Sequence, residues 1–309
     1  MFSKRCDGRK LTNGVDPFTR FVPLIMTKRN DAMVMSTQYI DCDKINKYIN
    51  DRRKEGVQMS HMAVLIAAIL RTYAEFPMLN RFVINKTLYA RTDFVCTFIA
   101  VQNSDIENYM ETDVKLHFDL TDTIDTVQKR MDAGIEEARK DAENSGTVKF
   151  ANAILKIPLL PRIIVGILKW LDAWGVLSKD LIDISPFHSS LFITNMASLK
   201  MGYVYHHIYN FGNTSIFVGL GKREQQLKMG SDGNVTVKNV YPLGITVDER
   251  IAPGAQFAQA FQTMVKYINN PVILETPPEK VNYDVGMKPY TIDEKYKLEK
   301  KNGNSVKAD

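Results

Sequence analysis

The sequence predicts an α/β fold in which helices flank a mixed sheet, and three observations support this prediction. Long segments carry apolar residues at helical spacing, whereas shorter segments rich in β-branched and aromatic residues have the pattern of strands. The 309 residues suffice for a large core, and a hydrophobic content of 45% with 24% charged residues is typical of a globular protein. We therefore expect one domain over residues 17–278, preceded by an N-terminal arm (1–16) and followed by a polar C-terminal tail (279–309).

The predicted helices are defined by their end residues. Asp41 or Asp43 supplies the N-cap of the first helix. Ser60 caps a second, buried helix that Pro77 ends. A third helix over residues 123–143 carries an apolar stripe at alternating three- and four-residue spacing, as expected for a helix with one buried face. That stripe comprises Ile124, Val127, Met131, Ile135 and Ala138.

The remaining segments indicate strands and one tight turn. Residues 1–16 are polar and punctuated by glycine, and we expect them to be loosely attached. The β-favouring residues over 17–39 predict an early strand. The Asp-Gly pair within Ser231–Asn234 supplies the positive φ values of a hairpin turn. Further strands are predicted over residues 81–89, 94–101, 190–195, 215–222, 235–240 and 245–250.

Composition argues against several classes of function. The net charge of +5 is small, the Lys and Arg residues gather mainly near the two ends, and no nucleic-acid-binding motif is present, so we expect no nucleic-acid partner. The three widely spaced cysteines match neither a disulfide framework nor a metal-binding pattern. No apolar segment of a secretory signal follows the basic N-terminal residues. These features predict a cytoplasmic protein without a bound metal.

One segment carries a recognisable motif. Residues 245–274, ITVDERIAPGAQFAQAFQTMVKYINNPVIL, combine a strand, a Pro-Gly turn, an amphipathic helix over 255–268 and an Asn-Pro stop. This order resembles the D-H-R-V-x-D-G-A segment, helix and N-P-x-x-L of the acyltransferase domain of 2-oxoacid dehydrogenase complexes and of chloramphenicol acetyltransferase. In an ungapped alignment, the catalytic His of that family falls on Glu249 and its second Asp on Pro253. The matching residues are Asp248, Arg250, Gly254, Ala255, Asn270 and Pro271.

Three further stretches are similar to the same family. Residues 60–81 resemble its early helix, which begins at Ser and ends in P-x-L-N, and residues 119–140 occupy the place of its long helix. Residues 190–223 are similar to its T-I-S-N-L-G segment and the strand that follows. The four stretches occur in the family's order, so the resemblance extends over roughly residues 20–278.

The resemblance implies a fold and a chemistry. The fold would be a chloramphenicol-acetyltransferase-like sandwich with a mixed sheet and flanking helices, assembled as a homotrimer whose active sites lie between subunits. The co-substrate would be an acyl-coenzyme A or carrier-protein thioester, with no tightly bound cofactor. In the family, the His is the general base on the acceptor, and the Ser of T-I-S-N-L-G donates a hydrogen bond to the tetrahedral oxyanion.

Two residues fall at these catalytic positions. Thr194 stands in place of the Ser and keeps its hydroxyl, so it is either the oxyanion donor or a β-branched strand residue that bonds a backbone group. Glu249 stands in place of the His. It would serve as acid or base if burial raised its pKa, or it is a structural residue that pairs with a basic side chain.

The resemblance also assigns residues around the catalytic pair. Those expected to shape the turn are Asp248, Arg250, Pro253 and Gly254. Those expected on the substrate side are Asn195, His206 and His207. Because Pro253 has no carboxylate, we do not expect the family's ordering ion pair at that position. His206 and His207 precede a strand rather than the closing helix, so we expect a structural or acceptor-contact role for them and not catalysis. His61 and His188 have no motif around them and are expected in core or surface roles.

Residues 150–187, FANAILKIPLLPRIIVGILKWLDAWGVLSKDLIDISPF, form a helical insertion in place of a short linker of the family. Pro161 suits the start of a helix, but the prolines and charges leave no uninterrupted apolar stretch long enough to span a bilayer. Three interpretations stay open. The insertion is a lid or apolar acceptor pocket over the active-site channel, a subunit contact, or a peripheral membrane contact with Trp170 and Trp174 at headgroup depth.

The leading prediction is an acyltransferase-like protein that transfers an acyl group from a coenzyme A or carrier thioester to an unidentified acceptor, with Glu249 and Thr194 as the catalytic residues. An apolar or lipid-linked acceptor would suit the insertion. The alternative is a catalytically inactive trimeric pseudoenzyme that acts as a scaffold or ligand-binding subunit, because fold analogy alone does not choose between the two.

Overall fold

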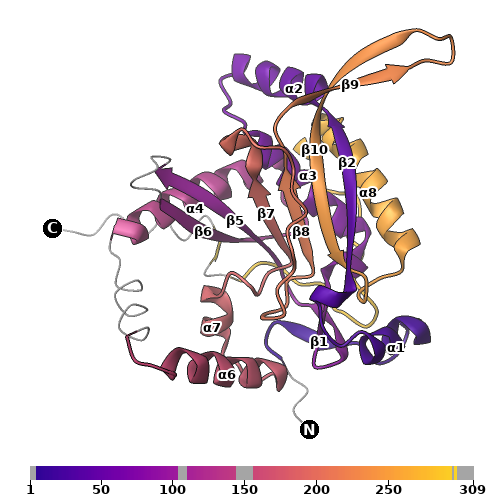
Figure 1. The fold of residues 1–309 in the computed structure, drawn as a ribbon. Coiled ribbons are helices and arrows are strands. Elements are labelled where there is room, and N and C mark those ends of the chain that lie inside the picture. The colour runs from indigo at the N-terminus through magenta and orange to yellow at the C-terminus, as the bar shows by residue number, and fades with distance from the viewer. Residues whose placement is uncertain (1–4, 104–109, 144–155, 294–295, 298–309) are drawn as a thin grey trace.

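A seven-stranded mixed sheet forms the centre of the structure (Figure 1). The computed structural model describes residues 5–103, 110–143, 156–293 and 296–297. The strands follow the order β2-β10-β8-β7-β5-β6, and β9 pairs with the outer part of β10. Strand β7 runs parallel to β5 and β8, and the other pairs are antiparallel. The strands are β2 Met33–Asp41, β5 Phe94–Asn103, β6 Met110–Phe118, β7 Leu191–Asn195, β8 Ile216–Leu220, β9 Glu224–Met229 and β10 Val235–Asp248.

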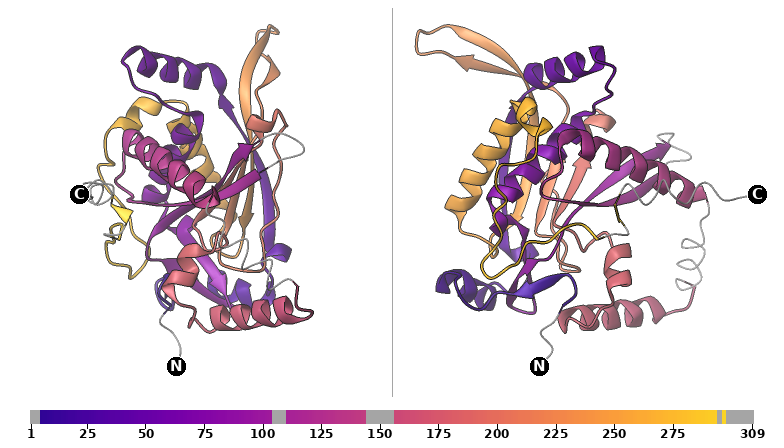
Figure 2. Two further views of the ribbon diagram at one scale, coloured as in Figure 1. Left: turned by 90° about the vertical axis from the view of Figure 1, so that its left-hand side faces the viewer. Right: turned by 180° about the vertical axis from the view of Figure 1, so that it is seen from behind.

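Helices cover one face of this sheet, and the side view in Figure 2 shows the two layers. Helix α3 is buried over nearly its whole length and packs with α8 and α4 on the main core. The opposite face is covered by the irregular segment 201–213, whose Ile208 packs with Phe192 and Phe217 of the sheet. The helices are α1 Pro17–Ile25, α2 Cys42–Lys54, α3 His61–Glu75, α4 Ile124–Glu143, α6 Leu160–Ala173, α7 Lys179–Ile184 and α8 Gly254–Ile268.

Most predicted elements are confirmed, together with the α/β class and its mixed sheet. Asp41 caps α2, and Ser60 caps α3 through a hydrogen bond from the backbone N–H of Ala63. The predicted hairpin turn joins β9 to β10, with Gly233 at a φ of 79°. These elements have strong local signals, so the sequence was enough to find them.

The early strand is wrong over residues 17–25, which form α1. The carboxylate of Asp16 accepts a hydrogen bond from the backbone N–H of Thr19 at 2.9 Å, and Pro17 occupies the first turn. An acidic cap followed by proline is a helix start, and here it outweighs the β-favouring composition. The strand begins only at Met33, where β2 starts.

The expectation of a loosely attached N-terminus is also wrong for the residues that the structure describes. β1 (Gly8–Lys10) pairs with β4 (Thr87–Arg91), and β3 (Arg81–Ile84) completes a small second sheet. Strands β3 and β4 together replace the single strand predicted over residues 81–89. Arg5 and Asp7 are buried. Pairing with a strand far along the chain carries no local signal, so the sequence did not indicate it.

The C-terminal segment 279–293, expected as a polar extended tail, has no helix or strand and is tied to the body. Asp284 accepts hydrogen bonds from the guanidinium of Arg81 at 2.5 and 2.7 Å. Ile292 is buried. No helix among the described residues is long and apolar enough to cross a membrane.

Candidate active site

A buried ion-pair cluster fixes the chain where β10 ends. Asp248, the last residue of β10, is fully buried and accepts hydrogen bonds from the Nε and Nη2 atoms of Arg250, both at 2.7 Å. The Nε of Arg29 lies 3.4 Å from the same carboxylate. Two guanidinium groups around one carboxylate hold the turn that follows β10 in a single conformation. Asp248 and Arg250 therefore hold this turn, and their part in an active site stays a prediction.

Arg29 is the residue of this cluster that the sequence did not indicate. Its guanidinium donates hydrogen bonds to the carbonyl oxygens of Tyr209, Gly212 and Val83 at 2.7–2.9 Å. Burial lowers the pKa of Arg29 to about 10, while Asp248 opposes this shift. Since Arg29 lies far from Asp248 in the sequence, no spacing pattern could have connected them.

Glu249 lies beside this cluster with its side chain exposed. Its backbone N–H donates to the carbonyl of Ala32 at 3.0 Å. Glu249 lines a surface cavity of about 810 Å³. Residues of α1, β2, α8 and the end of β10 form the walls of this cavity. Pro253 and Gly254 line the same cavity, and Pro253 occupies the N-cap position of α8 without a side-chain hydrogen bond. The predicted turn residues are thus together at one end of the sheet.

Thr194 lies on β7, in the interior of the sheet. It is 7% exposed, and among the described residues its hydroxyl has no hydrogen-bond partner. Thr194 pairs with Gly219 on the neighbouring strand β8, and Gly219 pairs with Gly244 on β10. A buried hydroxyl without a partner is a costly arrangement that a bound acceptor group would relieve. The hydroxyls of Thr97 and Thr246 are likewise buried without a partner among the described residues, so the oxyanion role of Thr194 stays a prediction.

Thr194 and Glu249 do not meet within one chain. The register places Thr194 level with Gly244, two strand spacings away. Glu249 comes five positions after Gly244, one residue past the end of β10. At about 3.3 Å per residue and about 4.8 Å per strand, the two α-carbons lie on the order of 20 Å apart. Joint action on one substrate atom needs contacts of about 3 Å, so Thr194 and Glu249 of one chain cannot act together.

The segment that carries His206 and His207 lies over the same sheet face as Thr194. An added Cβ at Gly219 or Gly244 would come within 2.7 or 2.4 Å of the carbonyl oxygen of Val204, so the two glycines let this segment lie directly on the sheet. The His206 ring stacks on Phe217 with centroids 4.6 Å apart, whereas His207 is exposed. His206 has a structural contact here, and an acceptor contact stays a prediction for both histidines.

Asn195 has a local role in the structure. Its Oδ1 accepts a hydrogen bond from the backbone N–H of Ser198 at 3.3 Å and caps the turn after β7. It also lines a cavity of about 130 Å³ together with His61 and Tyr241. The His61 Nε2 lies 2.8 Å from Asn46 Oδ1. A substrate contact for Asn195 would have to come from this cavity.

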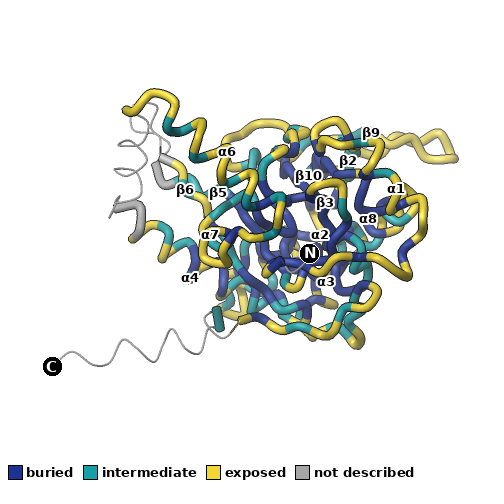
Figure 3. The backbone as a smooth tube through the Cα atoms, turned by 90° about the horizontal axis from the view of Figure 1, so that it is seen from below, coloured by how far each residue is buried: buried dark blue, intermediate teal, exposed yellow. Residues whose placement is uncertain are grey.

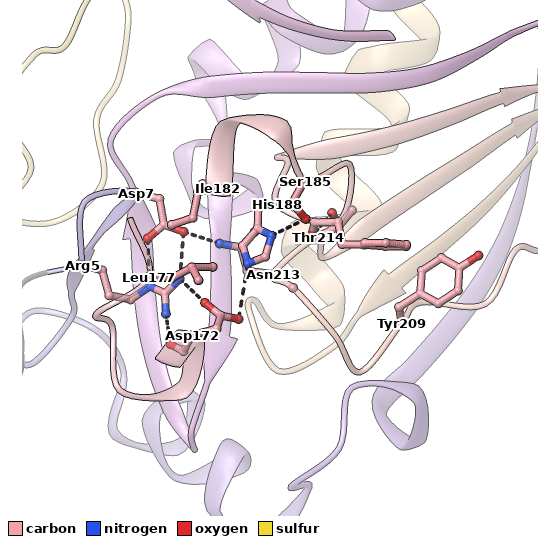
Figure 4. A network of polar contacts seen from close by, with 12 residues as sticks. Arg5, Asp7, Asp172, Leu177, Ile182, Ser185, His188, Tyr209, Asn213 and Thr214 are labelled. Atoms are coloured by element: carbon pink, nitrogen blue, oxygen red, sulfur yellow. Dashed lines mark hydrogen bonds and ion pairs between the residues drawn. The ribbon is translucent and has the colours of Figure 1, made fainter. Parts of the chain in front are cut away.

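The insertion is held by a buried polar network, drawn in Figure 4. Asp172 of α6 accepts a hydrogen bond from Arg5 at 2.7 Å and lies 3.4 Å from His188 Nε2. His188 Nδ1 lies 2.8 Å from the Ser185 hydroxyl. Ser185, His188 and Asp172 are arranged like a catalytic triad, but His188 is only 1% exposed and the cavity that it lines measures only about 10 Å³. The network therefore ties α6 to the N-terminal residues, and His188 has the core role expected of it.

The insertion does not cover Glu249. None of its described residues lines the cavity around Glu249, and α6 instead lies along the base of the molecule (Figure 1). Residues 150–155, at the start of the insertion, lie outside the described residues. The described part thus gives no support to a lid over the Glu249 cavity. Among the described residues, no group of His, Cys, Asp and Glu is arranged to hold a metal ion.

A family model matches part of the chain. Residues 187–275 match the model described as 2-oxoacid dehydrogenases acyltransferase (catalytic domain). A comparison with curated proteins gave no match.

Solved structures show a similar fold. The truncated catalytic core of the 2-oxoacid dehydrogenase multienzyme complex from Thermoplasma acidophilum has a TM-score of 0.50 at 13% identity and covers 85% of this chain and 99% of that one. The cubic core of the pyruvate dehydrogenase multienzyme complex gives 0.49 at 13% identity, over 85% of this chain and 94% of that one. Chloramphenicol acetyltransferase gives 0.44 at 11% identity, over 84% and 99%.

The matched residues 187–275 include both Thr194 and Glu249, and the fold is that of chloramphenicol-acetyltransferase-like acyltransferases. The resemblance predicted from the sequence is therefore confirmed: the chain is similar to the 2-oxoacid dehydrogenase acyltransferase catalytic domain, with its family signature in residues 187–275.

Proposed function

We propose that this protein is an acyltransferase that uses an acyl-coenzyme A or carrier-protein thioester and works as a homotrimer. The observation that carries the proposal is the buried, unpartnered hydroxyl of Thr194 at the family's oxyanion position. The family match over residues 187–275 supports acyl transfer in general. The acyl group would pass from thioester to acceptor through a tetrahedral intermediate, whose oxyanion Thr194 would bind.

Glu249 is proposed as the acid or base, contributed by the neighbouring subunit. Since Thr194 and Glu249 lie on the order of 20 Å apart in one chain, each site would combine Glu249 of one subunit with Thr194 of the next. A carboxylate within hydrogen-bond reach of the acceptor in such an interface would accept its proton.

The surroundings of Glu249 support a subunit interface there. Helix α1 and strand β2 border the Glu249 cavity and present large apolar side chains to solvent in the single chain. An exposed apolar surface of this kind marks an interaction site. These side chains are Phe18 (70% exposed), Phe21 (53%), Ile25 (64%), Val34 (43%), Met35 (49%) and Tyr39 (42%).

Thiol release from a panel of acyl-coenzyme A thioesters tests the proposal. Thr194→Val, which keeps the shape but removes the hydroxyl, should lower kcat by about two to three orders of magnitude, and Thr194→Ser should restore most of it. Glu249→Gln should lower kcat by about two to four orders of magnitude. The matched control is Glu279→Gln, because Glu279 is an exposed carboxylate away from the site.

A trimeric pseudoenzyme is the second candidate, favoured by the exposed Glu249 and by Pro253 in place of an ordering Asp. It predicts a trimer that neither binds nor cleaves any thioester, with the Thr194 and Glu249 variants unchanged in assembly. Thioester turnover that survives in Thr194→Val and Glu249→Gln alike would reject the assigned residues while keeping the reaction.

A further inference from the structure

Helix α6 has its apolar side facing solvent. Ile163, Ile167, Trp170 and Trp174 follow one another at spacings of four, three and four residues, so they form one stripe. They are 56%, 52%, 60% and 46% exposed. The only residue of α6 in the buried class is Asp172. An ordinary surface helix buries its apolar stripe, whereas α6 exposes this one together with Arg162 and Lys169.

The polar network explains how α6 keeps this orientation. Asp172 is anchored by Arg5 and His188, so the helix is fixed from its polar side. A 14-residue helix has little stability of its own in water, and the anchor adds to the partial burial of Ile164, Leu168 and Leu171. Figure 3, a view from below, shows α6 as largely exposed at the edge of the molecule. The exposed stripe is therefore held in place and available to a partner.

The apolar character extends beyond α6 over the described part of the insertion. Further large apolar side chains in this part are exposed, and together with the stripe they exceed what single scattered surface residues would give. They are Ile157 (53%), Leu159 (63%), Val165 (44%), Val176 (46%), Leu181 (45%) and Ile184 (75%).

Positive charge lies beside the stripe. Lys169 of α6 borders a surface cavity of about 340 Å³ that Lys28 and Lys86 also line. Asp172 also lines this cavity, but its charge is compensated by Arg5. Arg162 lies about two turns before Lys169 on α6 and is exposed. The chemistry that fits both features is an anionic phospholipid, whose phosphate suits the lysines and whose acyl chains suit the stripe.

We propose that the insertion binds the surface of an anionic lipid bilayer, with the α6 stripe at the boundary between headgroups and acyl chains and a lipid phosphate in the lysine-lined cavity. A flat bilayer contacts a row of exposed side chains without requiring matched shape, which a folded partner protein would need. This inference is independent of the proposed acyl transfer.

The experiment uses the two tryptophans of the chain, Trp170 and Trp174, which both lie in the insertion. Purified full-length protein is mixed with phosphatidylcholine vesicles, with or without phosphatidylglycerol. With anionic vesicles, the tryptophan emission should shift to shorter wavelength, brominated acyl chains should quench it, and the protein should float with the vesicles. Neutral vesicles and high salt should weaken all three effects.

Variants separate the stripe from the charges. The double substitution Ile163→Glu and Ile167→Glu should weaken flotation by about tenfold or more. Lys86→Glu with Lys169→Glu should remove the preference for anionic vesicles. The matched control, Leu227→Glu with Val237→Glu, changes equally exposed residues on the β9–β10 hairpin at the opposite end of the molecule (Figure 1) and should leave flotation unchanged.

Two results would overturn the inference. The first is that anionic vesicles change neither the tryptophan emission nor the flotation of the wild type, or change them equally in the wild type and in the variant with Ile163→Glu and Ile167→Glu. The other is an emission shift that depends on protein concentration without vesicles, which would show that a second copy covers the stripe. Release of thiol from soluble acyl-coenzyme A should be the same in the wild type and the stripe variant, so the two proposals fail separately.

Discussion

Asp248 is the residue on which the geometry around Glu249 depends. Its carboxylate compensates two buried guanidinium groups, those of Arg250 and Arg29, and it occupies the last position of β10. The direction in which Glu249 leaves the sheet follows from this anchor. The contact from Arg29 to Asp248 adds a second link that holds this turn.

Asp248→Ala should lower the free energy of unfolding by about 3–5 kcal/mol, because it leaves two arginines buried without their partner. Urea denaturation followed by circular dichroism measures this change. The control is Glu136→Ala, which removes an exposed partner of Lys140 and should leave the urea midpoint in place. Equal midpoints for the two variants would show that the cluster does not stabilise the fold.

Lys115 makes stability depend on pH. Burial lowers its pKa to about 8, and its Nζ donates to the carbonyl oxygens of Ile182 and Ser185. In the unfolded chain the pKa is about 10.4, so between these values the unfolded state binds the extra proton and stability rises with pH. The stabilising contribution is complete above the unfolded value and is lost as pH falls to about 8.

Relative to Lys115→Met, the wild type should therefore gain about 2 kcal/mol of unfolding free energy between about pH 8 and about pH 10. Urea titrations of both proteins across this range give the difference and cancel groups that they share. Parallel pH profiles would mean that Lys115 keeps an ordinary pKa in the fold.

At the scale of elements, the glycines of the central strands allow segment 201–213 to lie on the sheet. Gly244→Ala would place a Cβ 2.4 Å from the carbonyl oxygen of Val204. We expect a loss of about 1–3 kcal/mol in unfolding free energy, and lower thioester turnover because the segment moves away from Thr194. Gly166→Ala in α6, where a Cβ meets nothing within 4 Å, should not destabilise the protein.

The polar network around Asp172 should determine how firmly the insertion is held, without affecting the stability of the main core. Asp172→Ala removes the partner of Arg5 and the neighbour of His188, and we expect limited proteolysis to cut within residues 156–184 before the rest of the chain. Mass spectrometry of the fragments locates the cuts. Asp180→Ala, on an exposed position of α7, should keep the wild-type pattern. An unchanged pattern in Asp172→Ala would show that other contacts hold the insertion.

At the scale of the whole molecule, the separation of Thr194 from Glu249 predicts complementation between subunits. Thr194→Val and Glu249→Gln proteins, each inactive alone, should regain about a quarter of wild-type turnover when unfolded, mixed in equal amounts and refolded as random trimers. Native mass spectrometry shows the trimers and their mixing. Each variant refolded by itself is the control and should stay inactive. Mixed trimers that form but show no turnover would reject a site shared between subunits.

The sequence determined the elements whose signals are local and the family that they resemble. The capping residues Asp41 and Ser60 indicate the starts of α2 and α3, and Asp232-Gly233 indicates the turn of the β9–β10 hairpin. The motif around Glu249 carries the family resemblance. Each of these depends on residues within one turn or one strand. Such contacts form between neighbours in the chain, so the pattern alone reveals them.

Only the tertiary structure decided the rest. Three features depend on segments far apart in the chain. They are the ion pair between Arg29 and Asp248, the ion pair between Arg5 and Asp172, and the exposure of the apolar stripe of α6. The same holds for the distance between Thr194 and Glu249, which strand order and register set. The physical reason is that burial and charge pairing are properties of the assembled surfaces, and a local pattern does not say which surfaces will meet.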